Sequence, residues 1–265
     1  MFTWTKEMIE YYDREEKYDS YNRELSLFLY HFIKEKKTIL DVGCGVGLLS
    51  INFEEYNFNV DMVDISKEAI DFVKEKIKER KLKNTKAFIA NIKNTSKIKN
   101  KYDILIFSHF GKMEDIIKIS KKYLNANGRI IVLQKNYLQR RFSIQNSLYI
   151  CNSAKESIEY LQMKKIKFDS YDYSFKQKIP FMNIQDANKF FNIYSNNTFI
   201  KTKESIKKLT TETKINSQTK NSYSKEKSEK LVLEKIKKIK NKQYEYVYKS
   251  KKDIKIIIIQ GESIK

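Results

Sequence analysis

The 265-residue sequence has little of several residue types that close turns, cross-link chains or bind metals. It holds one proline, two histidines, two cysteines and six glycines. Two cysteines, Cys44 and Cys151, provide neither a disulfide framework nor the spacing of a metal site, so we expect no metal. The longest apolar runs, Ile256–Ile259 among them, are too short to cross a bilayer. Because the N-terminus also lacks the basic and apolar segments of a signal peptide, we expect a cytoplasmic protein without membrane contact.

The positive charge is large but unevenly distributed. The formal net charge is +20, and residues 1–100, 101–200 and 201–265 contribute +1, +8 and +11. A basic chain raises the expectation of nucleic acid as a partner. However, Lys, Ile, Asn and Tyr are all abundant, which is the residue usage of an AT-rich genome. Solvent-exposed lysines are the simpler explanation, and nucleic-acid binding by residues 201–265 stays open as the alternative.

The few glycines are concentrated in one stretch that predicts a turn between a strand and a helix. Gly43, Gly45 and Gly47 alternate after a short apolar strand pattern over 38–40 and the acid Asp41. Strand, glycine turn and helix make the first unit of an open α/β sheet, in which ligands bind at the carboxyl ends of the strands. Glycines suit such a turn because they accept positive φ and let the backbone approach a ligand closely.

The glycine spacing differs from that of dinucleotide-binding loops, which read G-x-G-x-x-G. Here the pattern is Asp-x-Gly-x-Gly-x-Gly, and its acid suits a positively charged ligand and would repel a phosphate. The pattern resembles the loop of class I S-adenosylmethionine (SAM) methyltransferases. The resemblance implies SAM as cofactor, wrapped by the loop at its methionine part. The implied contacts are Asp41, Gly43, Cys44, Gly45 and Gly47.

The segments after the loop extend this resemblance over residues 38–134. A second strand pattern over 58–64 ends at Asp64, where an acid accepts hydrogen bonds from ribose hydroxyls. The alternative for Asp64 is a structural role at the start of the next helix. For Asn91, which follows the third strand, the alternative to a ligand contact is an ordinary surface position. The resemblance also implies cofactor contacts after the second, third and fourth strands: Ile65 on the adenine, Asn91 and Ile92 at the adenine amino group, and Ser108 near the transferred methyl group.

The alternation of strands and helices over residues 38–134 predicts a parallel sheet. We expect an α/β, Rossmann-like fold with a seven-stranded, mostly parallel sheet, helices on both faces and an antiparallel last strand. Within it we expect a turn over 125–128 before a fifth strand, and a helix over 230–240. The expected divisions are an N-terminal helical lid (1–36), a SAM-binding core (37–134), a substrate-facing insertion (135–242) with a mobile stretch over 201–230, and a closing β-hairpin (243–265).

Two further segments resemble a bacterial, Clostridium-type branch of uncharacterised methyltransferases, namely Trp4–Ile9 and Asp186–Ser195. The resemblance implies methyl transfer from SAM to a small-molecule acceptor, through an oxygen, nitrogen or sulfur atom that the sequence does not identify. If that atom must lose a proton, His109 after the fourth strand is the candidate catalytic base. A histidine that only lines the cleft is the alternative. The candidate lid residues, whose aromatic rings could attract a sulfonium, are Tyr11, Tyr12 and Tyr18.

Other functions remain as alternatives. After the fourth strand the chain reads Ser-His-Phe-Gly and lacks the Pro-Pro segment of DNA amino methyltransferases, which disfavours that substrate. An RNA methyltransferase or RNA-binding protein would use the basic 201–265 region. A protein that binds SAM without catalysis is a third hypothesis. An NAD-dependent oxidoreductase is disfavoured by the glycine spacing, and the sequence does not indicate an oligomeric state.

Overall fold

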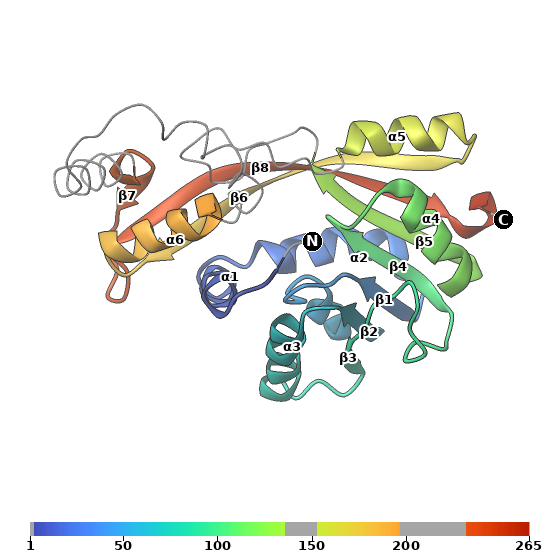
Figure 1. Cartoon of the computed structure of the whole chain (residues 1–265), viewed down its shortest axis with the longest axis horizontal. Helices are drawn as coiled ribbons and strands as arrows, with labels where there is room; N and C mark the ends of the chain where they lie inside the picture. Colours follow the sequence, from blue (N-terminus) through green and yellow to red (C-terminus); the bar gives the residue numbers. More distant parts are fainter. Residues whose placement is uncertain (1–2, 136–152, 197–231, 265) are drawn as a thin grey trace, which may run out of the picture. The chain divides into compact units, whose positions relative to one another are not determined.

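The computed structural model describes residues 3–135, 153–196 and 232–264. These residues belong to two compact units, the first with residues 3–135, 153–175 and 252–264 and the second with residues 176–196 and 232–251. Two long strands, β6 (Phe168–Phe181) and β8 (Tyr246–Gln260), run through both units (Figure 1). The predicted mobile stretch over 201–230 lies outside the described residues.

The described strands form one sheet of eight strands, one more than predicted. Its order is β3-β2-β1-β4-β5-β8-β6, and β7 pairs with β8. The first five strands pair in parallel, and β8 runs antiparallel to β5, which confirms the mostly parallel Rossmann-like sheet with a reversed strand. The remaining strands are β1 (Thr38–Val42), β2 (Asn59–Asp64), β3 (Thr85–Ile89), β4 (Tyr102–Ser108), β5 (Leu124–Lys135) and β7 (Ile236–Lys238).

In the first unit, helices cover both faces of the sheet, as predicted (Figure 1). The segments are α1 (Lys6–Tyr18), α2 (Tyr21–Ile33), the 3-10 helix η1 (Ser50–Tyr56), α3 (Lys67–Glu79), α4 (Met113–Tyr123), α5 (Ala154–Met163) and the 3-10 helix η3 (Gly261–Ile264). Because successive strand residues point to opposite faces, Ile39 and Ile104 pack with α2, η1 and α3, whereas Leu40 and Leu105 pack with α4, α5 and η3. All four are fully buried, and each contributes about 1.5–3 kcal/mol.

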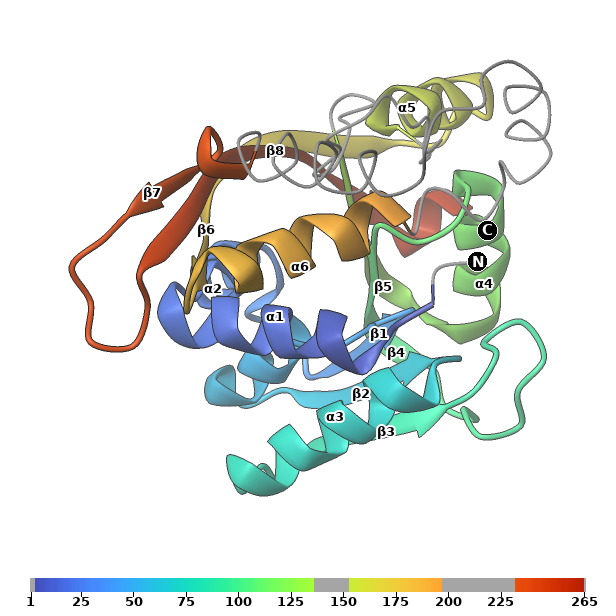
Figure 2. The same cartoon turned by 60° about the vertical axis from the view of Figure 1, so that its left-hand side comes forward.

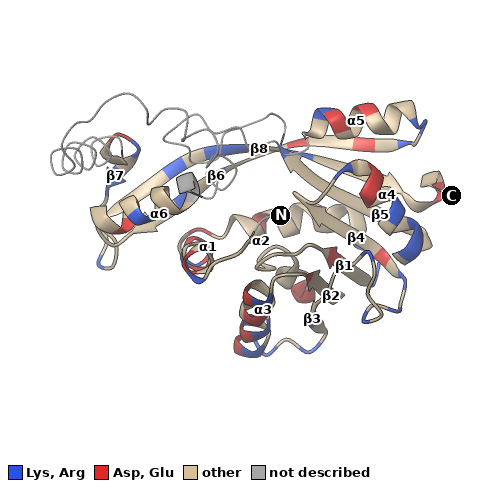
Figure 3. Cartoon of the chain, in the orientation of Figure 1, with Lys and Arg blue, Asp and Glu red and all other residues tan. Residues whose placement is uncertain are grey.

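The helix ends carry stabilising polar groups. The Ser66 side chain accepts a hydrogen bond from the backbone N–H of Ala69 and so caps α3. In α4 the acids Glu114 and Asp115 stand in the first turn and Lys121 and Lys122 in the last (Figure 3). This arrangement complements the helix dipole. No described helix combines the length and apolar character that a membrane crossing requires.

The predicted lid over residues 1–36 divides into two helices with different environments. Leu29 and Ile33 of α2 are fully buried in the core, so α2 is a core helix and its assignment to a lid is wrong. A half-buried side of α2 packs aromatic rings against the first half of β6. The ring pairs are Tyr21 with Phe175 (centroids 4.3 Å apart), Phe28 with Tyr173 (5.0 Å) and Phe32 with Tyr171 (4.7 Å).

The closing β-hairpin predicted over 243–265 is wrong. Residues 246–260 form the single strand β8, which pairs with β7 near its start and with β5 near its end. Residues 249–253 have neither glycine nor proline, the two strongest turn-forming residues. Because β8 has a partner strand at each end, its extended backbone continues through residues 249–253.

Two further local predictions differ from the structure because of strand pairing. Of the helix predicted over 230–240, residues 232–233 are helical, whereas residues 236–238 form β7, whose Ile236 pairs with Tyr248 of β8. Residues 125–128 do not form a turn before β5 but lie within it. There the pairing with β4 jumps from Tyr102–Leu124 to Ile104–Arg129, so these residues form a bulge.

The second unit contains α6 (Ile184–Asn196), β7 and the adjoining halves of β6 and β8. Its core is aromatic, with Phe181, Phe190 and Phe191 in mutual ring contact at centroid distances of 5.3–6.2 Å. Tyr248 of β8 adds an edge-to-face contact with Phe191 at 5.5 Å. Phe190 and Phe191 are at most 1% exposed, so this face of α6 is buried.

Asp103 should stabilise the start of the sheet through its charge. Its carboxylate accepts hydrogen bonds from the backbone N–H of Lys37 and Thr38, the Thr38 hydroxyl and the Asn125 amide, at 2.9–3.1 Å. Partial burial alone would raise the pKa of Asp103, but these hydrogen bonds outweigh it and lower the pKa. We expect Asp103→Asn to reduce the free energy of unfolding by about 1–3 kcal/mol at pH 7.

The pH dependence follows from the sign of this shift. A lowered pKa means that the contribution is complete above the ordinary value near 4 and is lost as the pH falls through the folded value. Urea denaturation from pH 7 to pH 3 should therefore show the two proteins converging below about pH 4. Asp169→Asn, at an exposed position on β6, is the control and should behave like the wild type. A constant difference across the pH range would contradict the role of the charge.

Candidate functional site

The glycine loop after β1 is held by hydrogen bonds to the end of β2. The backbone N–H groups of Gly43 and Cys44 both donate to the carbonyl of Val63, at 2.8 and 3.1 Å. The N–H of Gly45 donates to Oδ2 of Asp64 at 2.9 Å. These loop amides therefore donate to β2, whereas the amides of a phosphate-binding loop point at the ligand.

Asp64 connects the loop to the start of α3. Its Oδ2 accepts from Gly45, and its Oδ1 accepts from the N–H of Ser66 at 2.8 Å. The structural role considered for Asp64 is therefore present. Each carboxylate oxygen has about two acceptor sites, so it can also accept from a ligand hydroxyl. The neighbouring Ile65 is 43% exposed, which leaves an apolar side chain accessible beside the acid.

Asp41 is a buried acid with an unsatisfied oxygen. It lies within β1 and is only 2% exposed, and among the described residues its Oδ1 has no hydrogen-bond partner. Burial raises the pKa of Asp41 to about 7; the nearby Ser50 hydroxyl favours ionisation, and the charge of Asp64 opposes it. The Ser50 hydroxyl does not reach hydrogen-bonding geometry with any described group. A cation or N–H donor from a ligand would satisfy this acid.

Two aromatic side chains lie directly on the glycine loop. A Cβ placed on Gly43 would be 2.4 Å from Cδ2 of Phe110, and one placed on Gly45 would be 2.6 Å from Cζ2 of Trp4. Both glycines have positive φ, +69° and +54°, so a larger residue would be strained as well as crowded. Sequence reasoning did not single out these two rings as site residues. Glycines show that space is needed, but not which side chain fills it.

The helix α1 packs against the same loop. Ile9 of α1 is in an apolar cluster with Val46 and Leu48, and Trp4 and Tyr12 pack onto that cluster. An ion pair between Asp13 and Lys76 (2.9 Å) joins α1 to α3, and Figure 2 shows the two helices side by side. The position of α1 at the loop fits the lid hypothesis for this helix.

The three candidate tyrosines of α1 have different surroundings. Tyr12 belongs to the cluster at the loop, with its ring 5.2 Å from that of Trp4. Tyr11 is buried, and the guanidinium of Arg14 lies 4.9 Å from its ring centroid. Tyr18 is half-buried at the end of the helix. Tyr12 is thus placed with the glycine loop, and the roles of all three stay predictions.

The end of β4 turns sharply at His109. Ser108 is half-buried and is the last residue of the strand, and the N–H of His109 donates to the carbonyl of Leu133 on β5 at 2.8 Å. His109 is exposed and has φ of +54°, a left-handed conformation that is uncommon outside glycine. This turn allows the next residue, Phe110, to meet Gly43.

The two predicted adenine contacts after β3, Asn91 and Ile92, differ in burial. Asn91 is exposed, and its Oδ1 accepts from the N–H of Lys93 at 3.1 Å, which leaves capacity for a second hydrogen bond. Ile92 is only 5% exposed and packs in the core, and its carbonyl accepts from the Tyr123 hydroxyl. Ile92 would therefore contact a ligand through its backbone.

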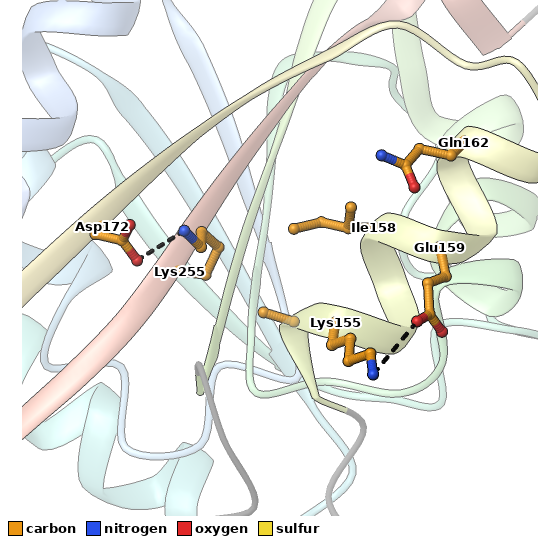
Figure 4. Close-up of a pocket in the computed structure, with 7 residues that line it drawn as sticks. Lys155, Ile158, Glu159, Gln162, Asp172 and Lys255 are labelled. Atoms are coloured by element: carbon orange, nitrogen blue, oxygen red, sulfur yellow. Dashed lines mark ion pairs between the residues drawn. The ribbon is translucent and has the colours of Figure 1, made fainter.

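A separate cavity of about 440 Å³ lies on α5, β6 and β8 (Figure 4). Lys255 and Asp172 form an ion pair there (2.7 Å), and Lys155 and Glu159 form a second one (3.8 Å). The charges in this cavity are thus paired with each other. In the sheet order β8 and β6 are separated from β1 by β4 and β5, so this cavity is not part of the glycine-loop site.

Comparisons with known proteins find relatives over part of the chain. Residues 24–163 match the methyltransferase small domain. An uncharacterised protein from Rickettsia prowazekii is 30% identical over 145 residues, which are 50% of this chain and 57% of that protein. A ubiquinone biosynthesis O-methyltransferase from Pelagibacter ubique is 32% identical over 118 residues, 42% of this chain and 48% of the relative. The chain thus spans about half the length of the curated relatives it matches.

A solved structure shows the same fold. It is a putative methyltransferase from Bacillus halodurans, which aligns with 90% of this chain and 98% of its own length at 11% identity and a TM-score of 0.52. The Clostridium-type branch stays a prediction. The matched domain covers residues 24–163 and includes β1 through α5, with the glycine loop, Asp64 and His109. The chain therefore belongs to the methyltransferase small domain family, and its fold is that of the class I SAM-dependent methyltransferases.

Proposed function

We propose that this chain binds SAM at the carboxyl ends of β1 and β2 and transfers its methyl group to a small-molecule acceptor. The observation that carries the proposal is the buried carboxylate of Asp41, whose Oδ1 has no hydrogen-bond partner among the described residues. It lies beside a loop in which the amides of Gly43, Cys44 and Gly45 are bonded to β2. Such a site suits a ligand with cationic groups. It is unsuited to a pyrophosphate, because Asp41 and Asp64 would repel phosphate and the three loop amides already donate hydrogen bonds to β2.

The residues present fit the cofactor that family membership implies. Asp41 would hold its charged end, Asp64 its ribose hydroxyls and Ile65 its adenine, and Asn91 and Ser108 would add polar contacts. SAM supplies an activated methyl group when bound. The chain binds and orients the two reactants, which can account for much of a rate enhancement. We further propose His109 as the base for acceptors that must lose a proton, since it stands exposed at the end of β4.

The small-molecule acceptor is supported by the relative from Pelagibacter ubique, which is named a ubiquinone biosynthesis O-methyltransferase. The RNA alternative rests on the basic 201–265 region, much of which lies outside the described residues. The assignment of acceptor specificity to residues 135–242 stays a prediction.

The pKa of Asp41 should make cofactor binding depend on pH. A cationic ligand favours the ionised carboxylate, and the pKa of Asp41 is about 7. Below that value, binding must release a proton, so the Kd for SAM should rise towards tenfold per unit as the pH falls and level off above about pH 7. Calorimetry in buffers of different ionisation enthalpy measures both effects.

Asp41→Asn is the reference for this experiment. It removes the titrating carboxyl group, whereas any pH dependence that comes from the ionisable groups of SAM itself stays the same. This variant should bind SAM more weakly at pH 8 and show a shallower pH dependence. Equal pH dependence in the two proteins would mean that Asp41 does not face the ligand.

Asp64→Ala should weaken SAM binding by about 10- to 100-fold, because it removes charge-assisted hydrogen bonds to the ligand and the anchor of Gly45. Calorimetry with SAM, S-adenosylhomocysteine and NAD should show saturable binding of the first two only. Asp71→Ala, an exposed acid on α3, is the matched control and should bind as the wild type does. Unchanged SAM binding by Asp64→Ala would show that the site is misplaced, and saturable NAD binding would favour the oxidoreductase alternative.

The RNA alternative predicts a steep salt dependence. If phosphate contacts drove binding, the affinity for a short RNA would fall linearly with the logarithm of salt concentration, with a slope of about −0.7 per neutralised phosphate on single strands. Fluorescence anisotropy from 50 to 300 mM salt would measure it. We expect no saturable binding, and a steep slope with tight binding at low salt would favour RNA as the substrate.

A further inference from the structure

The two aromatic rings on the glycine loop come from distant parts of the chain. Trp4 precedes α1 and Phe110 follows β4, yet both contact the same turn. At Gly45 the atoms Cζ2, Cε2 and Nε1 of Trp4 lie 2.6–3.2 Å from the Cβ position. At Gly43 the atoms Cδ2 and Cε2 of Phe110 lie 2.4 and 3.0 Å from it. The absence of side chains at these glycines thus lets two rings approach the loop backbone.

Both rings are held in place by neighbouring groups. The ring of Trp4 meets that of Tyr12 edge-on, with centroids 5.2 Å apart and planes at 68°. Thr5 caps α1 by accepting from the N–H of Met8, so the residue next to Trp4 is fixed at the helix start. Phe110 packs against the buried Phe107 at 5.6 Å. Positioned rings lose little conformational entropy when a ligand binds.

The charges around these rings favour a positive ligand. Asp41 lies at the end of β1, directly before the loop, and Asp64 bonds to the loop itself. An aromatic face attracts a cation through its quadrupole, and tryptophan does so most strongly. A neutral ligand of the same shape gains nothing from this attraction. The site therefore contains two independent features, acids and aromatic faces, that distinguish ligands by charge.

We propose that Trp4 and Phe110 are aromatic walls of the cofactor site that favour the sulfonium of SAM over the neutral thioether of its product, S-adenosylhomocysteine. This inference rests on the proposed function. It assigns the two rings a specificity role, because they lower the free energy of the charged cofactor and not that of the product. Weaker retention of the product would then promote its exchange for fresh cofactor.

Calorimetry with SAM and S-adenosylhomocysteine on the wild type and on Trp4→Leu tests the inference. Trp4→Leu should weaken SAM binding by about 2- to 30-fold, the range that cation–π contacts span. Binding of S-adenosylhomocysteine should change less, so the ratio of the two affinities falls. Trp4→Phe keeps an aromatic face and should retain most of the ratio, and Phe110→Leu should shift the ratio in the same direction as Trp4→Leu.

Tyr171→Leu on β6 is the control, since it removes an aromatic ring far along the sheet from β1. It should leave the ratio unchanged, and thermal unfolding of each variant checks that it folds. Equal weakening of both ligands by Trp4→Leu, or no change in either, would overturn the specificity role while leaving the proposed function intact. Failure of the wild type to bind either ligand would overturn the proposed function and this inference with it.

Discussion

The hydrogen bonds between the glycine loop and the last two residues of β2 are the constraint on which the candidate site depends. The carbonyl of Val63 and the carboxylate of Asp64 take the amides of Gly43, Cys44 and Gly45. Because β2 pairs with β1 on one side and β3 on the other, the sheet itself sets the position of the loop. The same carboxylate also receives the first N–H before α3. One acid therefore aligns strand, loop and helix, and leaves no loop amide for a phosphate among Gly43, Cys44 and Gly45.

The carboxyl end of the sheet concentrates features that cost stability. Asp41 is buried, with one oxygen that has no hydrogen-bond partner in the part of the chain that the structure describes, and His109 has a left-handed backbone. Local rules of folding tend to be broken at functional sites, where a ligand or a reaction needs the arrangement. The rest of the first unit supplies the compensation through alternating apolar strand residues, packed on both faces of the sheet. A ligand with cationic groups would relieve the cost at Asp41, which explains how a stable fold tolerates that acid.

The accuracy of prediction varies along the chain for physical reasons. From β1 to α4 each element carries its own periodic apolar pattern, and the strands predicted over 38–40 and 58–64 agree with β1 and β2 within two residues. The capping serine of α3 and the acids at the start of α4 are also local signals. The errors lie where a distant strand decides the structure. β8 continues through residues 249–253 because β5 and β7 pair with its two ends, and Ile236 joins β7 although its neighbourhood suits a helix.

The sequence by itself determined the α/β class and the position of the loop, because strand alternation, helix periodicity and glycine spacing are local. It also indicated a cationic ligand, because the glycine spacing differs from that of dinucleotide-binding loops and the acid Asp41 precedes the first glycine. Only the tertiary structure decided which groups surround that acid. Its burial, the use of the loop amides by β2 and the contacts of Trp4 and Phe110 all involve segments distant in the chain. Desolvation and hydrogen-bond partners depend on those distant segments, so no local pattern of residues specifies them.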